Sequence, residues 1–136
     1  MNRMIFLSDK FPLVLIFIGG GLGSLARYAA GKAFASWAPV FPLGTLAANV
    51  FACLILGVFS GWAALRTGES VATYRAFVVV GFCGGFSTFS TFSNDTIQLI
   101  LNNAWTEACL NVFVSILFCL AATLLGMWLG KQLLSI

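Results

Sequence analysis

The sequence predicts an all-α membrane protein with four transmembrane helices. Hydrophobic residues make up 60% of its 136 residues and charged residues only 8%, whereas soluble domains carry roughly a quarter charged residues. A helix needs about 20 apolar residues to cross a bilayer. Four stretches have that length, about Leu13–Ala35, Gly44–Leu65, Arg75–Leu101 and Ala108–Gly130. They fill most of a single domain, residues 1–136, and leave no room for a soluble domain.

The first span raises the alternative of a cleaved signal peptide. Met1–Lys10 carries positive charge before an apolar run, and Ala33-Phe34-Ala35 resembles a signal-peptidase site. The run is too long and too rich in glycine for a signal peptide, and Arg27 and Lys32 interrupt it. These features favour a retained first helix.

Short connections separate the spans. Residues 36–43 contain Pro39 and Pro42, which disfavour helix, and the other two connections are about Arg66–Tyr74 and Asn102–Glu107. Connections this short make successive helices antiparallel neighbours.

Each span contains two glycines four residues apart, a spacing that lets helix backbones approach closely in lipid. The pairs are Gly19/Gly23, Gly57/Gly61, Gly81/Gly85 and Gly126/Gly130. In the third span the adjacent Gly84-Gly85 precedes a run of hydroxyl residues, and we expect the helix to break there. The carbonyls of an unwound segment can hold a cation.

The loop charges lean to one side of the membrane. With both termini on that side, it holds five cationic residues and the other side holds only Lys32, or Lys32 and Arg27. The five are Arg3, Lys10, Arg66, Arg75 and Lys131. The positive-inside rule therefore predicts cytoplasmic termini.

The third span carries the most informative segment. Residues 84–93 read Gly-Gly-Phe-Ser-Thr-Phe-Ser-Thr-Phe-Ser, and five hydroxyls in seven residues exceed what helix packing requires. The positive edge of a phenyl ring, as at Phe89 and Phe92, can meet a small anion. Fluoride is compact and strongly hydrated, so it needs many hydrogen-bond donors to leave water. Such donors are available from Asn49, Ser90, Thr91 and Ser93.

Other polar residues in the spans have two interpretations each. Arg27 is either a functional intramembrane charge or an anchor that reaches the interface. Asn49 can donate to an anion or join two helices, and Asn111, Ser115 and Thr123 share one helix face, where they can also simply join helices. Asp95, the only carboxylate within a span, is either an ion site or an interfacial charge.

Several classes of function are excluded or disfavoured. The chain has no histidine, and none of its four cysteines forms a CxxC pair, so we expect no zinc or haem site. Thiols within spans are expected to act as small apolar residues. No nucleophile–base pair can be assembled, so we expect no enzyme. The net charge of +3 is too small and scattered for nucleic-acid binding.

The sequence resembles the Fluc (CrcB) fluoride channels over all four spans. The resemblance rests on residues 84–93, on Gly44-Thr45-Leu46-Ala47-Ala48-Asn49 and on Gly23-Ser24-Leu25-Ala26-Arg27-Tyr28. It implies a dual-topology homodimer of two antiparallel four-helix subunits with two pores. A single four-helix bundle is also too thin to hold its own aqueous path.

The resemblance also implies roles for individual residues. Phe89 and Phe92 would form an aromatic box, with Asn49 as its polar partner. Arg27 would lie in the vestibule, and the polar track would include Ser90, Thr91, Ser93, Ser115 and Thr123. The carbonyls of Gly84 and Ser87 of both subunits would hold a structural sodium ion. Two departures are Asp95, where glutamate is expected, and Cys119, which stands between Ser115 and Thr123 at a polar pore position. A third is the one-sided distribution of loop charges, which agrees poorly with dual topology.

We therefore expect a passive fluoride channel in a bacterial inner membrane. One rival is a small multidrug exporter, which needs a glutamate in its first helix, where this chain has Arg27 and no carboxylate. The other rival is a membrane scaffold whose polar residues serve only helix packing.

Overall fold

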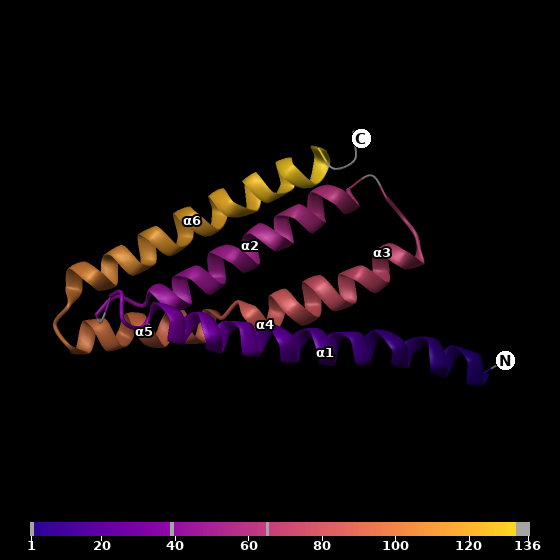
Figure 1. The fold of residues 1–136 in the computed structure, drawn as a ribbon, viewed down its shortest axis with the longest axis horizontal. Coiled ribbons are helices and arrows are strands. Elements are labelled where there is room, and N and C mark those ends of the chain that lie inside the picture. The colour runs from indigo at the N-terminus through magenta and orange to yellow at the C-terminus, as the bar shows by residue number, and fades with distance from the viewer. Residues whose placement is uncertain (1, 39, 65, 133–136) are drawn as a thin grey trace.

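The computed structural model is all-helical, and it describes residues 2–38, 40–64 and 66–132, with side chains from residue 11 onward (Figure 1). Within these residues, four segments are long and apolar enough to cross a membrane: Phe11–Phe34, Leu43–Ala63, Glu69–Leu101 and Trp105–Gln132. The third starts earlier than predicted, directly after Gly68, whose φ of 129° favours glycine. Pro39 and the predicted end of the second span, Leu65, lie outside the described residues.

Three of the four segments are continuous helices, namely α1 (Asn2–Phe34), α2 (Leu43–Ala63) and α6 (Trp105–Gln132). The third is divided into α3 (Glu69–Tyr74), a π-helical segment η1 (Arg75–Cys83), α4 (Gly84–Phe86) and α5 (Phe89–Leu101). The sequence did not predict the π-helical segment. The start of α1 and the end of α6 lie at the same end of the bundle (Figure 1).

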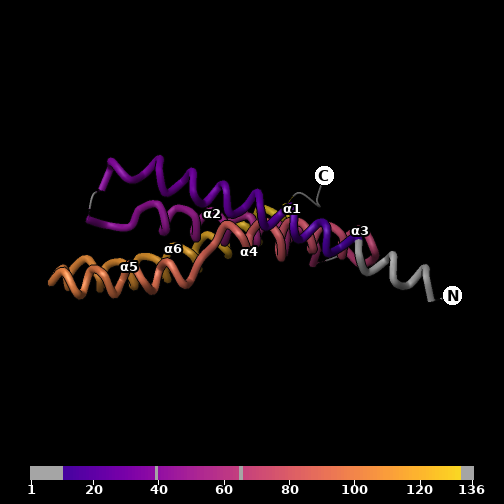
Figure 2. The backbone as a smooth tube through the Cα atoms, turned by 90° about the horizontal axis from the view of Figure 1, so that it is seen from below, coloured from indigo at the N-terminus to yellow at the C-terminus, as the bar shows by residue number. Residues whose placement is uncertain are grey.

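The membrane segments form two close pairs. The second and fourth segments pair as α2 with α6, and the first pairs with the first part of the third, as α1 with η1 and α4. After the third segment's interruption, α5 packs on α6 and α2. At the end of the molecule away from the N-terminus, Figure 2 shows α1 and α2 on one side and α5 and α6 on the other.

Glycines allow the close approach in both pairs. A Cβ on Gly57 would overlap the carbonyl oxygen of Thr123, and one on Gly126 would overlap that of Leu54. In the other pair, a Cβ on Gly23 would overlap the carbonyl oxygen of Phe82. All four glycine pairs named from the sequence lie at such contacts, in agreement with the predicted small-residue packing.

Gly57→Ala is expected to lower the free energy of unfolding by about 1–3 kcal/mol, because the new methyl group has to push α6 away from α2. Thermal denaturation of the detergent-purified protein measures the change. Gly31→Ala is the matched control, since no heavy atom lies within 4 Å of a Cβ placed there. Equal melting temperatures for the two variants would contradict this account of the helix contact.

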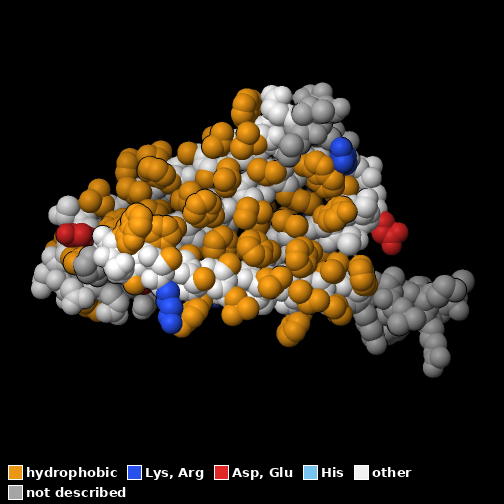
Figure 3. Space-filling view, viewed as in Figure 1, with side chains coloured by type: hydrophobic (Ala, Val, Ile, Leu, Met, Phe, Trp, Pro, Cys, Tyr) orange, Lys and Arg blue, Asp and Glu red, His pale blue; other side chains and the backbone are white. Residues whose placement is uncertain are grey.

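The outer surface is apolar along most of its length. Figure 3 shows hydrophobic side chains over most of the visible face, with few charged side chains, most of them near its two ends. The interior is small by comparison, with a core of Ala48, Ala52, Cys83 and Phe86. An apolar exterior around a small core is what a multi-pass membrane protein presents to lipid.

Candidate functional site

The third membrane segment loses its helical backbone at Ser87 and Thr88, where ψ is 154° and 111°. The sequence predicted a break at Gly84-Gly85, and that position is wrong. Gly84 has helical dihedrals (φ −63°, ψ −36°), and its N–H bonds within the helix. Gly85 packs against the backbone of Gly20 in α1. The glycines therefore serve helix packing, and the extended backbone comes three residues after Gly84.

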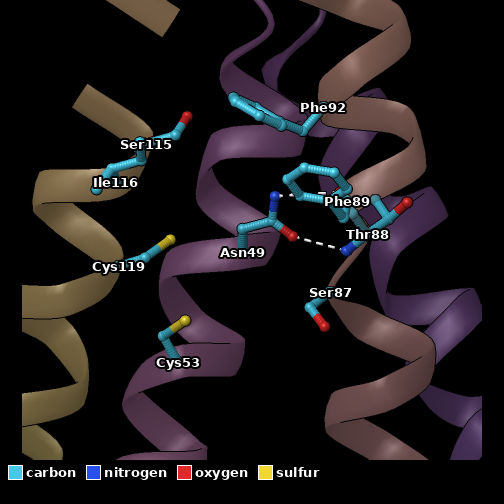
Figure 4. A pocket seen from close by; sticks show the side chains of 9 residues that line it. All are labelled: Asn49, Cys53, Ser87, Thr88, Phe89, Phe92, Ser115, Ile116 and Cys119. Carbon is cyan, nitrogen blue, oxygen red and sulfur yellow. Dashed lines mark hydrogen bonds between the residues drawn. The ribbon is translucent and has the colours of Figure 1, made fainter. Parts of the chain in front are cut away.

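Asn49 of α2 compensates the extended backbone. Its Oδ1 accepts a hydrogen bond from the Thr88 N–H at 2.7 Å, and its Nδ2 donates to the Thr88 carbonyl oxygen at 3.3 Å (Figure 4). In lipid an unpaired backbone amide or carbonyl costs several kcal/mol, so this two-fold contact makes the interruption tolerable. An amide NH₂ carries two N–H groups, and the bond to Thr88 uses one of them.

The Thr88 side chain begins the following helix. Its Oγ1 accepts from the Thr91 N–H at 3.1 Å, as an N-cap, and lies 3.0 Å from Thr91 Oγ1 and 3.1 Å from Ser90 Oγ. Thr88 is buried, whereas Ser90 and Thr91 are exposed. Thr88 was missing from the predicted site residues. The signal that could have found it is a hydroxyl residue just before an apolar helical run.

A cavity of about 270 Å³ lies beside the interruption (Figure 4). It brings together four predicted pore residues from three helices, namely Asn49 from α2, Phe89 and Phe92 from α5, and Ser115 from α6. The two rings lie 5.6 Å apart at 42° to each other. The Phe89 ring is 80% exposed, so the cavity is open on the side of this ring. Its other lining residues are Cys53, Ser87, Thr88, Ile116 and Cys119.

A buried polar chain joins α5 to α6 next to the cavity. Asn111 Nδ2 donates to Thr96 Oγ1 at 2.9 Å, and Ser115 Oγ donates to Asn111 Oδ1 at 3.4 Å. Asn111 is only 1% exposed. The sequence left open whether these residues line a path or join helices. Asn111 joins α6 to α5, whereas Ser115 bonds Asn111 within α6 and lines the cavity.

The remaining predicted pore residues lie off the cavity lining. The Thr123 hydroxyl donates to the Cys119 carbonyl of its own helix at 2.9 Å. Ser93 is half-buried on α5. Arg27 is half-buried on α1, which packs on η1 and α4, and it makes no ion pair with any residue in the described part of the chain. The chain thus gathers the aromatic pair with Asn49 and Ser115 at one cavity, and the other predicted pore residues lie elsewhere.

Asp95 has a specific partner. Thr45 Oγ1 of α2 donates to Asp95 Oδ2 at 2.7 Å, and both residues are half-buried. This bond holds α5 to the start of α2, one helical turn before Asn49. A link between helices is thus one role of this carboxylate.

The interruption also changes the bonding of two backbone carbonyls. In a continuous helix the Gly84 carbonyl would accept from the Thr88 N–H, which instead donates to Asn49. The Ser87 carbonyl would accept from the Thr91 N–H, which instead donates to Thr88 Oγ1. Both carbonyls are available to an outside ligand. Oxygen donors of this kind suit a sodium ion, although one chain offers too few to enclose it.

Comparison with known proteins identifies the family. Residues 14–127 match the family described as CrcB-like protein, Camphor Resistance (CrcB). The chain is similar to proteins named fluoride-specific ion channel FluC from Escherichia coli O9:H4 (strain HS) and from Escherichia coli strain SE11. Each is 40% identical over 117 residues, which cover 86% of this chain and 91% of the relative.

These matches confirm the resemblance seen in the sequence and the expectation that the protein is not an enzyme. Together with the four apolar helical segments, they make it a multi-pass membrane protein. The chain therefore belongs to the CrcB family.

Proposed function

We propose that the protein is a passive, fluoride-selective ion channel. The observation that carries this proposal is the cavity in which two phenylalanine rings meet an asparagine amide beside an interrupted helix. The relatives named as fluoride-specific channels support it. The interruption matters because it brings polar groups to membrane depth without leaving the Thr88 backbone unpaired.

Each lining residue contributes one interaction to a dehydrated anion. The ring edges of Phe89 and Phe92 present partial positive charge, and the second N–H of Asn49 donates a hydrogen bond. The Ser115 hydroxyl on the opposite wall turns from Asn111 Oδ1 to donate its one O–H to the anion. The polar track is completed by the predicted residues Ser90, Thr91, Ser93 and Thr123, and Arg27 attracts anions to the entrance.

The channel is a homodimer of antiparallel subunits with two pores. Support comes from the open side of the cavity, where the Phe89 ring and the polar Ser90 and Thr91 are exposed within a membrane-spanning segment. Polar groups are costly against lipid, and a second copy of the chain would cover them. The mass of the purified complex in detergent tests this, and a mass corresponding to one chain would contradict it.

The carbonyls of Gly84 and Ser87 of both subunits would hold a structural sodium ion. When bound, it would supply positive charge next to the carbonyl dipoles of the two interrupted helices. The support for this site is that hydrogen bonds from Thr88 and Thr91 to other groups release both carbonyls. Replacing sodium by N-methylglucamine on both sides of the membrane should then weaken the dimer and slow conduction. Unchanged dimer mass and conduction would contradict this site.

The physiological task is export of fluoride from the cytoplasm across the bacterial inner membrane. Neutral hydrofluoric acid enters through lipid and dissociates inside the cell. An inside-negative potential favours anion exit by about 2.3 kcal/mol per 100 mV, so neither ATP nor a coupled ion is needed.

Fluoride release from liposomes tests the proposal. The purified protein is reconstituted into vesicles loaded with fluoride, a potassium ionophore balances charge, and a fluoride electrode records release. We expect rapid fluoride release from these vesicles and retention of chloride in a parallel sample. No release from folded, dimeric protein would contradict the channel and favour an exporter or a scaffold.

A further inference from the structure

Two of the four cysteines are brought together by the contact between α2 and α6. The helices run parallel, and their backbones approach where Gly57 meets Thr123 and Gly126. Cys53 lies one turn before Gly57, and Cys119 lies one turn before Thr123. The shared register makes the two cysteines neighbours across the helix pair, and both line the same cavity.

Both thiols line the cavity described above. Figure 4 shows the side chains of Cys53 and Cys119 side by side, one turn from Asn49 and Ser115 respectively. Both residues are half-buried and form no disulfide. Cys83 is buried in η1 and Cys109 is exposed on α6, and neither lines this cavity. The sequence alone predicted that the thiols act as small apolar residues.

We propose that Cys53 and Cys119 form a binding site for a single soft divalent metal cation of the mercury(II) type, whose occupancy closes the cavity to fluoride. The binding site stands on the thiol pair alone, whereas closure rests on the proposed channel function.

The donor set selects the kind of cation. Soft thiolate ligands prefer soft metals, and the described residues contain no group of three or more His, Cys, Asp or Glu side chains that would suit a zinc-like site. Two ligands are enough for mercury(II), which favours linear coordination by two sulfurs.

Charge balance favours a divalent ion over a monovalent one. When mercuric chloride binds, two S–H bonds and two Hg–Cl bonds break, and two Hg–S bonds form. Two protons and two chloride ions leave to water, and no atom changes oxidation state. The bound unit of one divalent cation and two thiolates is neutral, and a neutral unit avoids the cost of an uncompensated charge at membrane depth.

Occupancy would obstruct the path beside the wall that carries Asn49 and Ser115. The bound ion bridges α2 and α6 within a cavity of only about 270 Å³. The bound ion also restricts the motion of α2 and α6 where they carry Asn49 and Ser115. An anion that needs these donors would no longer pass.

The first test measures fluoride release in the presence of micromolar mercuric chloride. In the C83S/C109S variant, which keeps only the cavity thiols, we expect release to fall at least tenfold and to recover after addition of dithiothreitol. The matched C53S/C119S variant keeps the other two thiols. Mercuric chloride should leave the rate of fluoride release by this variant unchanged. Equal sensitivity of the two variants, or none in C83S/C109S, would overturn closure by this pair.

The second test measures binding and does not depend on conduction. In detergent-solubilised C83S/C109S, one mercury ion per chain should hide both thiols from a maleimide reagent and release two protons. Two mercury ions per chain, or one thiol still reactive after one ion has bound, would overturn the shared site. This titration needs no fluoride transport. It therefore still tests the mercury site if the proposed channel function proves wrong.

Discussion

Fluoride release is expected to fall about 100-fold when Phe89 or Phe92 is replaced by isoleucine. Isoleucine keeps the apolar bulk of the side chain but lacks the ring, and with it the positive edge that meets a dehydrated anion. A loss of about 3 kcal/mol of stabilisation at the barrier corresponds to this fall, since each 1.36 kcal/mol changes a rate tenfold. Release from liposomes, recorded with a fluoride electrode, gives the rates.

The matched controls are Phe113→Ile and Phe118→Ile on α6. Both rings are exposed, at 67% and 54%, and neither lines the cavity with Asn49. These variants should conduct as the unchanged protein does. If the Phe89 and Phe92 variants conduct equally well, the aromatic pair only packs the protein, and the scaffold interpretation gains support.

Asn49→Leu is expected to reduce both stability and conduction. It removes the acceptor for the Thr88 N–H and the donor to the Thr88 carbonyl. The Thr88 carbonyl still accepts from the Phe92 N–H at 3.4 Å, so only the Thr88 N–H is left unpaired. A buried backbone group left unpaired costs about 1–3 kcal/mol, and the free energy of unfolding should fall by about that amount. We expect fluoride release to fall more than tenfold, because the extended backbone at Thr88 loses its support and the cavity loses an amide donor.

Two further variants separate the roles of Asn49. Asn49→Asp keeps an acceptor for the Thr88 N–H but places a carboxylate on the cavity wall, so it should lose less stability than Asn49→Leu and still conduct poorly. Asn102→Ala removes an exposed amide that bonds only the Gln98 carbonyl of its own helix, and it should change neither property. Normal melting and conduction in Asn49→Leu would show that the contact with Thr88 is dispensable.

The outline of the fold follows from composition and hydropathy. Four apolar stretches of membrane length predicted the four helical segments, and the structure begins and ends them within a few residues of the prediction, except at Glu69. The spacing of four between glycines predicted the helix contacts, because only a residue without a Cβ lets another backbone come so close. These features depend on residues near each other in the chain.

The position of the interruption depends on a partner far away in the chain. Gly84-Gly85 has the local preference to break a helix, yet it stays helical because α1 packs against it. Ser87 and Thr88 become extended where Asn49, 39 residues before Thr88, accepts from the displaced Thr88 N–H and donates to the Thr88 carbonyl. The Thr88 hydroxyl marks the start of the following helix locally, but no local pattern shows which residue pairs with the displaced Thr88 N–H.

The sequence by itself determined the membrane class, the number of spans, the family and the residues of the aromatic pair. Only the tertiary structure decided which residues share a cavity, that Asn111 bonds Thr96, and that Cys53 lies beside Cys119. The physical reason is that hydropathy and glycine spacing act along one helix. The register between two helices, by contrast, is set by backbone contacts such as that of Gly57 with Thr123.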